Sequence, residues 1–284
     1  GENSYPNIPK DISAITTRMP EYLRDIDEAL VFVRQYKDRI IYSENLGFLT
    51  YNGKLWLCSQ EGPKRFFHEF TKNQIEFAEH QLGCIGKRVE AAKYKAQKAG
   101  ENLSRQRIVK AEKELKDLKD EHKKLEGCKS FLLACRDNRK ISGIIKQAQA
   151  HFDIEDKKFD SLAFIINTPR GEIDLRTGEL HPHNPESLHT KMTTVGPSEE
   201  GMDIWEKFLN VIACDDQDLI DYLQLIVGAI LYGKVYIENL FIAYGHGKNG
   251  KSTFFNSIAK VLGSYARQIS AESMTTRRYN QKNY

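Results

Sequence analysis

A glycine-rich stretch near the C-terminal end constrains this chain of 284 residues more than any other feature. Residues 245–252 read Gly-His-Gly-Lys-Asn-Gly-Lys-Ser, which is the pattern G-x-x-x-x-G-K-S. An apolar run at 240–244 precedes it, and apolar residues at helical spacing follow over 254–262. A strand, a glycine loop and a helix in this order predict a phosphate-binding loop. The alternative is an ordinary glycine turn that caps a helix.

The residue types in this loop are suited to binding a nucleoside triphosphate. Glycines allow backbone N–H groups to curl around an anion, and the N-terminal end of the next helix favours negative charge. Lys251 would reach the β- and γ-phosphates of ATP, and the Ser252 hydroxyl would ligate Mg²⁺. We therefore predict ATP and Mg²⁺ as cofactors, with Lys251 catalytic and Ser252 on the metal. The predicted binding set is Gly245, His246, Gly247, Lys248, Asn249, Gly250, Lys251, Ser252 and Thr253.

The residues after the loop lack the other parts of a phosphate-hydrolysing enzyme. Such an enzyme needs an acidic strand that holds the metal and orients water. Residues 264–284 contain one carboxylate, Glu272, and the chain begins with Gly1 rather than methionine. We therefore expect an excised piece of a longer protein, cut inside its ATPase domain. This piece alone is expected to hydrolyse ATP poorly or not at all.

The composition is that of a soluble chain, with 40% hydrophobic and 29% charged residues. No apolar stretch approaches the roughly 18 residues of a membrane span. Five irregularly spaced cysteines predict neither a disulfide framework nor a C-x-x-C metal pair, so we expect reduced thiols and a cytoplasmic protein. Between residues 85 and 130, fourteen Lys and Arg face eight Asp and Glu. This segment either attracts a polyanion or forms a solvated helix surface.

The first third of the chain predicts a helix and a hairpin. Apolar residues at intervals of three and four predict an amphipathic helix over 20–37. Asn52-Gly53, between the apolar segments 48–51 and 54–57, predicts a β-hairpin with a tight turn. Trp56 in this hairpin either stacks on a nucleic-acid base or packs against a helix, and packing is the favoured interpretation.

Two long helical patterns follow. A helix over 71–99, a break at Gly100 and a second, heptad-like helix predict a projecting antiparallel hairpin. The seam of the second helix is Ile108, Ala111, Leu115, Leu118, His122 and Leu125, in which His122 is interpreted as a packing residue. Lysines that could engage DNA phosphates without sequence preference are Lys87, Lys93, Lys95, Lys98, Lys110, Lys113, Lys116, Lys119, Lys123 and Lys124.

The region after residue 160 changes character. Strands are predicted at 162–166 and 173–175, with turns at 168–171 and 177–178. His181, His183 and His189 lie close in sequence and suggest a metal site, but no cysteine or carboxylate completes a convincing ligand set, which favours a structural role. Two helices follow, over 204–212 and 219–231, and the aspartates between them are expected to cap the second.

These segments, in this order, resemble the phage, plasmid and poxvirus primase–helicases, whose motor belongs to helicase superfamily 3. Three blocks carry the resemblance. The first is the turn-rich stretch 166–191. The second comprises Trp205, Phe208, Leu209, Tyr222, Leu223, Gln224, Gly228 and 231–233. The third is 240–242 with the phosphate loop and Leu262-Gly263-Ser264-Tyr265.

The resemblance implies a motor that translocates on single-stranded DNA and unwinds duplex at replication forks, as a ring that is typically hexameric, with an associated or fused primase. It implies an α+β fold with a mostly helical, collar-like, helicase-associated region over 1–236. Small β-hairpins and an inserted helical hairpin at about 71–130 belong to this region. A truncated P-loop α/β unit of AAA+ type would follow over 237–284.

Two other functions stay open from the residues. One is a P-loop kinase of a nucleoside or small molecule, although such folds commonly carry the loop near the N-terminus. The other is a non-catalytic oligomerisation or DNA-docking module that uses the lysine-rich hairpin.

Overall fold

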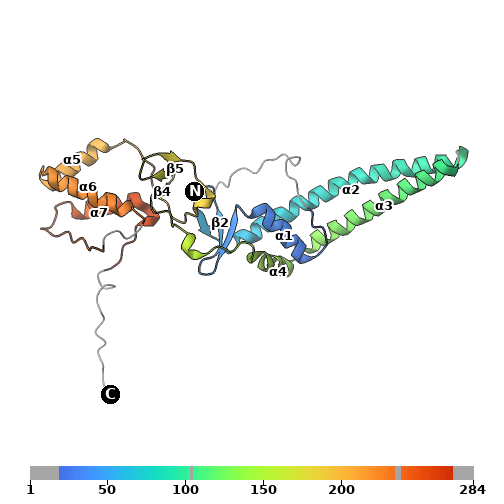
Figure 1. Cartoon of the computed structure of the whole chain (residues 1–284), viewed down its shortest axis with the longest axis horizontal. Helices are drawn as coiled ribbons and strands as arrows, with labels where there is room; N and C mark the ends of the chain where they lie inside the picture. Colours follow the sequence, from blue (N-terminus) through green and yellow to red (C-terminus); the bar gives the residue numbers. More distant parts are fainter. Residues whose placement is uncertain (1–18, 103–104, 234–237, 271–284) are drawn as a thin grey trace, which may run out of the picture. The chain divides into compact units, whose positions relative to one another are not determined.

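The computed structural model describes residues 19–102, 105–233 and 238–270 (Figure 1). The fold is α+β, mainly helical, with two small antiparallel sheets of three strands. The chain divides into two compact units, one ending at Asp156 and the other comprising Gly53–Trp56 and Lys157–Tyr284. The predicted domain boundary at 236–237 lies outside the described residues, as does Glu272, so that boundary stays a prediction.

The first unit contains four helices and a sheet in the order β1-β2-β3 within its described part. Its elements are α1 (Asp25–Tyr36), β1 (Ile40–Ser43), β2 (Gly47–Tyr51), β3 (Trp56–Cys58), α2 (Gly62–Asn102), α3 (Arg105–Ala134) and α4 (Asn138–Gln149). The predicted first helix is present but begins at Asp25 rather than at residue 20, and the predicted hairpin is confirmed. The hairpin loop spans residues 52–55, longer than the two-residue turn expected, and Gly53 takes the left-handed φ of 96° there.

An aromatic cluster forms the core of this unit. Phe32 is fully buried on α1, and its ring lies 5.0 to 6.0 Å from the rings of Tyr36, Phe67, Phe70 and Phe152. Aromatic pairs at these separations add stabilisation beyond the area that they bury. Because these side chains come from α1, α2 and the segment after α4, the cluster joins parts of the chain that are far apart in sequence.

The predicted helical hairpin is formed by α2 and α3, which run side by side in opposite directions (Figure 1). Ile85, Val89 and Ala92 of α2 are buried against Leu118 of α3. The predicted start of α2 at residue 71 was too late and the predicted break at Gly100 was too early, since the helix runs from Gly62 to Asn102. The additional turns of α2 carry Phe67 and Phe70, which are buried in the aromatic core. Their spacing of three residues places both on one face of the helix, as it does for the residues of the hairpin seam.

A carboxylic acid is buried where α1 meets α2. Glu28 has no exposed surface, and Gln74 Nε2 donates a hydrogen bond to its Oε2 at 3.4 Å. Removal from water disfavours the charged form and raises the pKa of Glu28 to about 7, while the bond from Gln74 opposes that shift.

This pKa makes the stability of the first unit pH-dependent. An unfolded glutamate titrates near about pH 4.3, so the folded chain holds an extra proton between that value and about pH 7. The stabilisation is complete below the unfolded pKa and is lost as the pH rises through 7. We expect the free energy of unfolding to fall by about 3 kcal/mol more in the wild type than in Glu28→Gln between pH 4.5 and 8. Urea unfolding at both pH values measures this difference, and identical pH profiles would refute it.

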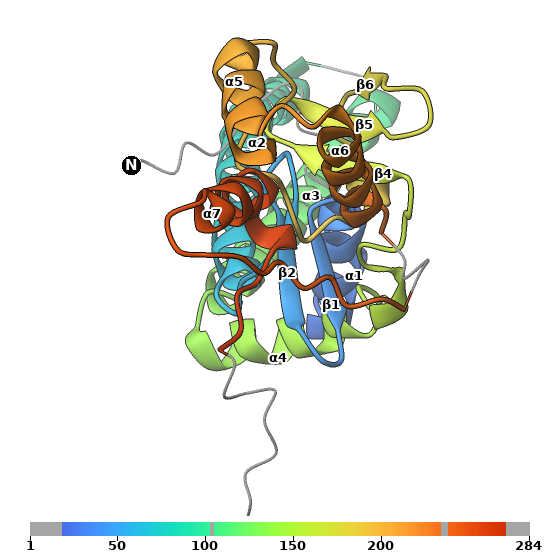
Figure 2. The ribbon, with the colours of Figure 1, turned by 90° about the vertical axis from the view of Figure 1, so that its left-hand side faces the viewer.

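Within its described residues, the second unit contains a sheet in the order β4-β5-β6 and three α-helices, which are labelled in Figure 2. Its elements are β4 (Ile165–Thr168), β5 (Gly171–Asp174), β6 (Leu180–His181), α5 (Met202–Ala213), α6 (Gln217–Leu231) and α7 (Lys251–Leu262). The strand predicted at 162–166 is shifted to β4, because Ile165 pairs with Asp174 and Thr168 with Gly171. Asp216 caps α6 as predicted, accepting from Leu219 N at 3.1 Å.

No helix within the described residues is both long enough and apolar enough to cross a membrane. All five cysteines carry free thiols. Burial raises the pKa of Cys135 to about 12, so this thiol stays protonated and unreactive at neutral pH and serves as a core residue.

Candidate functional site

The glycine loop forms an exposed turn directly before α7. Gly245 and Gly250 have φ values of 149° and 83°, a region that favours glycine. A Cβ on Gly245 would lie 2.7 Å from Asn249 Nδ2 and 3.4 Å from Lys251 Nζ. The inside of the turn is therefore occupied by two side chains, and any residue larger than glycine at 245 would obstruct it.

The ammonium of Lys251 lies in the concave side of this turn. Its Nζ donates to the carbonyl oxygens of Gly245 at 3.1 Å and His246 at 3.2 Å, and to Asn249 Oδ1 at 2.7 Å. Gly250 occupies the N-cap of α7 and supplies no side-chain cap for the first turn. Backbone donors and a cation thus meet at one helix start, which is an arrangement that can bind an anion.

The remaining predicted loop residues are solvent-exposed. His246, Gly247, Lys248 and Asn249 lie on the turn, and Ser252 and Thr253 lie in the first turn of α7. Lys248 takes a left-handed φ of 64°, which is uncommon for a residue with a side chain. Its position on the exposed turn leaves its amine free to reach a ligand from outside.

The strand predicted at 240–244 is not formed. These residues are irregular, and Leu240 and Ile242 are 78% and 75% exposed. A strand needs a neighbour to satisfy its backbone groups, and the described residues bring none beside this run. Within the described residues 238–270, the expected α/β unit therefore shows the loop and its following helix but no strand.

Helix α5 fixes the start of α7. The rings of Trp205 and Phe254 are stacked, with centroids 5.9 Å apart and an interplanar angle of 15°. A Cβ on Gly250 would lie only 2.4 Å from Ile212 Cγ2. Gly250 is thus required for two reasons, its backbone conformation and the close approach of α5. Trp205 belongs to the second block that carries the family resemblance, and its contact with Phe254 of α7 gives a structural reason for a tryptophan at this position.

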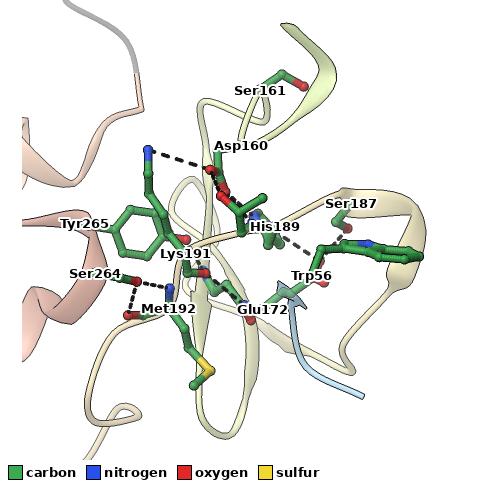
Figure 3. A network of polar contacts seen from close by, with 12 residues as sticks. Trp56, Asp160, Ser161, Glu172, Ser187, His189, Lys191, Met192, Ser264 and Tyr265 are labelled. Atoms are coloured by element: carbon green, nitrogen blue, oxygen red, sulfur yellow. Dashed lines mark hydrogen bonds and ion pairs between the residues drawn. The ribbon is translucent and has the colours of Figure 1, made fainter. Parts of the chain in front are cut away.

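A buried polar network lies beside the sheet of this unit (Figure 3). His189 is 3% exposed, with Nδ1 3.9 Å from Asp160 and Nε2 3.8 Å from Glu172. Burial lowers the pKa of His189, and the two carboxylates oppose that shift. Asp160 also accepts from Thr190 N at 2.8 Å and lies 3.6 Å from Lys191 Nζ. The network holds the segment after β6 against the strands.

The three histidines have separate contacts. His183 Nδ1 lies 3.1 Å from Asn167 Oδ1, whereas His181 is at the surface, 3.9 Å from Glu179. With His189 between Asp160 and Glu172, each ring serves a different structural contact. The geometry supports the structural interpretation over a shared metal.

Trp56 packs in the same network rather than standing free. It is 3% exposed, and its Nε1 donates to Pro185 O at 2.9 Å. Glu172 holds the same loop from the other side, accepting from Asn184 N and Ser187 Oγ, both at 2.8 Å. Trp56 is buried, as the packing interpretation expected, but its partner is the loop around Pro185 rather than an α-helix. A base-stacking role would require this loop to open.

The lysine-rich hairpin carries mixed charge. On α3 the exposed lysines alternate with exposed carboxylates, which are Glu112, Glu114, Asp117, Asp120, Glu121 and Glu126. On α2, Lys93 lies 2.6 Å from Glu90. His122 is half-buried in the seam and lies 3.6 Å from Glu126. The exposed face of α3 is therefore that of a solvated helix with mixed charge. DNA docking at the hairpin stays a prediction.

Two comparisons with known proteins bear on this chain. A family model described as "D5 N terminal like" matches residues 29–214, which is more than half of the sequence. No curated protein matches the chain. The matched range spans most of the first unit and β4 to α5 of the second, and it ends before the glycine loop.

Proposed function

The chain belongs to the D5 N-terminal-like family, whose domain occurs in phage and viral D5-type primase-helicases, and we propose that it is part of an ATP-dependent replicative DNA helicase. The family match covers residues 29–214, before the loop. The motor assignment rests on the loop itself, which lies outside the matched range. In this proposal residues 29–214 are the helicase-associated region, and residues 238–270 open the ATPase domain.

One observation carries the nucleotide site. Lys251 Nζ is held by two backbone carbonyls and Asn249 inside a turn in which Gly245 and Gly250 add no side chain of their own. These neutral acceptors are weaker partners for an ammonium than a phosphate oxygen is. A triphosphate entering the turn would therefore replace them, and it would meet the uncapped amides of the first turn of α7.

The loop residues have distinct roles in this proposal. The amides of 246–251 cradle the phosphates, and Lys251 neutralises the charge on the β- and γ-phosphates. The exposed hydroxyl of Ser252 holds Mg²⁺, with Thr253 beside it. When bound, Mg²⁺ supplies charge neutralisation on the phosphate oxygens. The hydroxyl is free for this role because Gly250, not Ser252, occupies the N-cap.

The remaining parts of the proposal follow from the family. The intact protein would act inside the host cell on single-stranded DNA at a replication fork, as a ring oligomer with a fused or associated primase. Family membership disfavours the small-molecule kinase, because the domain matched before the loop is one that occurs in D5-type primase-helicases.

Stimulation by DNA separates these functions. We expect the ATPase rate of the intact protein to rise several-fold on addition of single-stranded DNA, because a translocating motor couples hydrolysis to strand movement. The measurement is ATP turnover with and without an oligonucleotide, with a nucleoside acceptor as the comparison. A rate unaffected by DNA and accelerated by the nucleoside would establish the kinase instead.

A further inference from the structure

The far end of α7 is tied to the sheet of the second unit by hydrogen bonds of Thr194, Ser264 and Tyr265. From this geometry we propose that Ser264 and Tyr265 are positioning residues that hold the glycine loop in its binding shape from the opposite end of its helix. The inference rests on the proposed nucleotide site and adds how that site is held.

The last carbonyls of α7 are satisfied by the chain after β6. Thr194 Oγ1 donates to Lys260 O at 2.5 Å, and Thr194 N donates to Val261 O at 3.0 Å. Carbonyls at a helix end have no partner within the helix. Thr194 therefore caps α7 by one side-chain bond and one backbone bond, so a shift of this segment would move the helix end.

The turn after α7 completes this attachment (Figure 3). Ser264 Oγ accepts from Met192 N at 2.8 Å and donates to Met192 O at 3.1 Å. Gly263 has a φ of 57°, and a Cβ there would lie 2.7 Å from the same carbonyl. The close approach of two backbones thus explains a glycine followed by a small hydroxyl residue.

Tyr265 extends the attachment to strand β4. Its hydroxyl accepts from Asn167 N at 3.1 Å. Asn167 is fully buried, and its Nδ2 donates to Lys54 O at 3.0 Å and Lys191 O at 3.1 Å. Its carbonyl accepts from Thr193 N at 3.0 Å. Tyr265 is therefore anchored to a residue that is itself held from several sides. Burial raises the pKa of Tyr265 to about 12, so the hydroxyl is neutral at working pH.

Both ends of α7 are consequently fixed to the same unit. At the start of the helix, Phe254 stacks on Trp205 and Gly250 abuts Ile212. A helix of twelve residues is about 18 Å long. A small tilt at Ser264 is carried along this rigid element to Lys251, and a misplacement of about 1 Å of a reacting or positioning group can lower the rate of a catalysed reaction on the order of 100-fold.

Three variants test the proposal in the full chain. Ser264→Ala removes both side-chain bonds to Met192, and Ser264→Thr keeps the hydroxyl at an exposed position. Tyr265→Phe removes the acceptor for Asn167 N, and Tyr222→Phe is the matched control at a half-exposed tyrosine of α6. Two readouts are taken well below the unfolding temperature. One is hydrogen exchange, without ligand, of the amides over the loop and the first turns of α7 (246–258), where Phe254 N bonds back to Gly250 O. The other is affinity for ATP.

We expect Ser264→Ala and Tyr265→Phe each to speed loop exchange and weaken ATP binding by about fivefold, the usual worth of one net hydrogen bond. Ser264→Thr and Tyr222→Phe should stay within about twofold of wild type on the same scale. A lower unfolding temperature with unchanged exchange and affinity would overturn the proposal, since the residues would then be merely structural. If the wild type binds no ATP while loop exchange still accelerates, the nucleotide site fails and the positioning role stands.

Discussion

Replacing Lys251 by alanine is expected to lower the affinity of the chain for ATP by about 10- to 100-fold and to abolish ATP hydrolysis by the intact protein. A hydrogen bond to a charged group contributes about 1.5–3 kcal/mol, and this ammonium is the cation at the centre of the turn. Its loss also leaves the carbonyls of Gly245 and His246 facing the incoming phosphates. Calorimetric titration with ATP measures the affinity, and phosphate release measures turnover.

Lys260→Ala is the matched control for this variant. Lys260 lies on the same helix but in its last turn, and its side chain is exposed. Removing it takes away one charge without touching the loop, so ATP affinity should change by less than about threefold. Wild-type turnover by Lys251→Ala, or equal losses in both variants, would remove the basis for a phosphate site at this loop.

Phe32→Ala is expected to lower the free energy of unfolding of the first unit by about 3–5 kcal/mol. Phe32 is fully buried, and four aromatic rings surround it, so truncation leaves a cavity that the neighbours cannot fill. A loss of this size is a large part of the stability of a typical domain. Chemical unfolding followed by far-UV circular dichroism gives the value, since α1–α4 hold most of the helical residues.

Tyr94→Ala provides the comparison for this core variant. Tyr94 lies on α2 but is 60% exposed, and alanine is a good helix former, so the change should stay within about 0.5 kcal/mol. A loss for Phe32→Ala no greater than that for Tyr94→Ala would mean that the aromatic cluster is not the stabilising core of the unit.

The long periodic elements were the most predictable from sequence. The heptad seam around Leu118 and the helical pattern over 20–37 each recur over several turns, and one face of such a helix must be buried wherever it packs. The place of Phe32 at the centre of the core was not predicted. Short strands were less predictable. β1 and the exact start of β4 depend on which residue they pair with, and pairing partners lie elsewhere in the chain.

The glycine loop shows the same division. Its residue types specify a turn that only glycine can make at 245 and 250, followed by a helix, and both are present. The strand predicted at 240–244 did not form, because a strand requires a neighbouring strand and the sequence of this segment does not specify one. The role of the Gly263-Ser264-Tyr265 turn was not deduced from the sequence, since its partner Met192 lies far away in the chain.

The order of residues alone indicated most of the helices, the helical hairpin, the glycine turn before α7 and the chemistry that Lys251 can offer, because these depend on neighbours within a few residues. Helix α4 was not predicted. Only the tertiary structure decided that Trp56 and His189 are buried contacts and that α7 is held at both ends. Those outcomes depend on contacts between residues that are far apart in the chain, and the local sequence around each residue does not specify its distant partner.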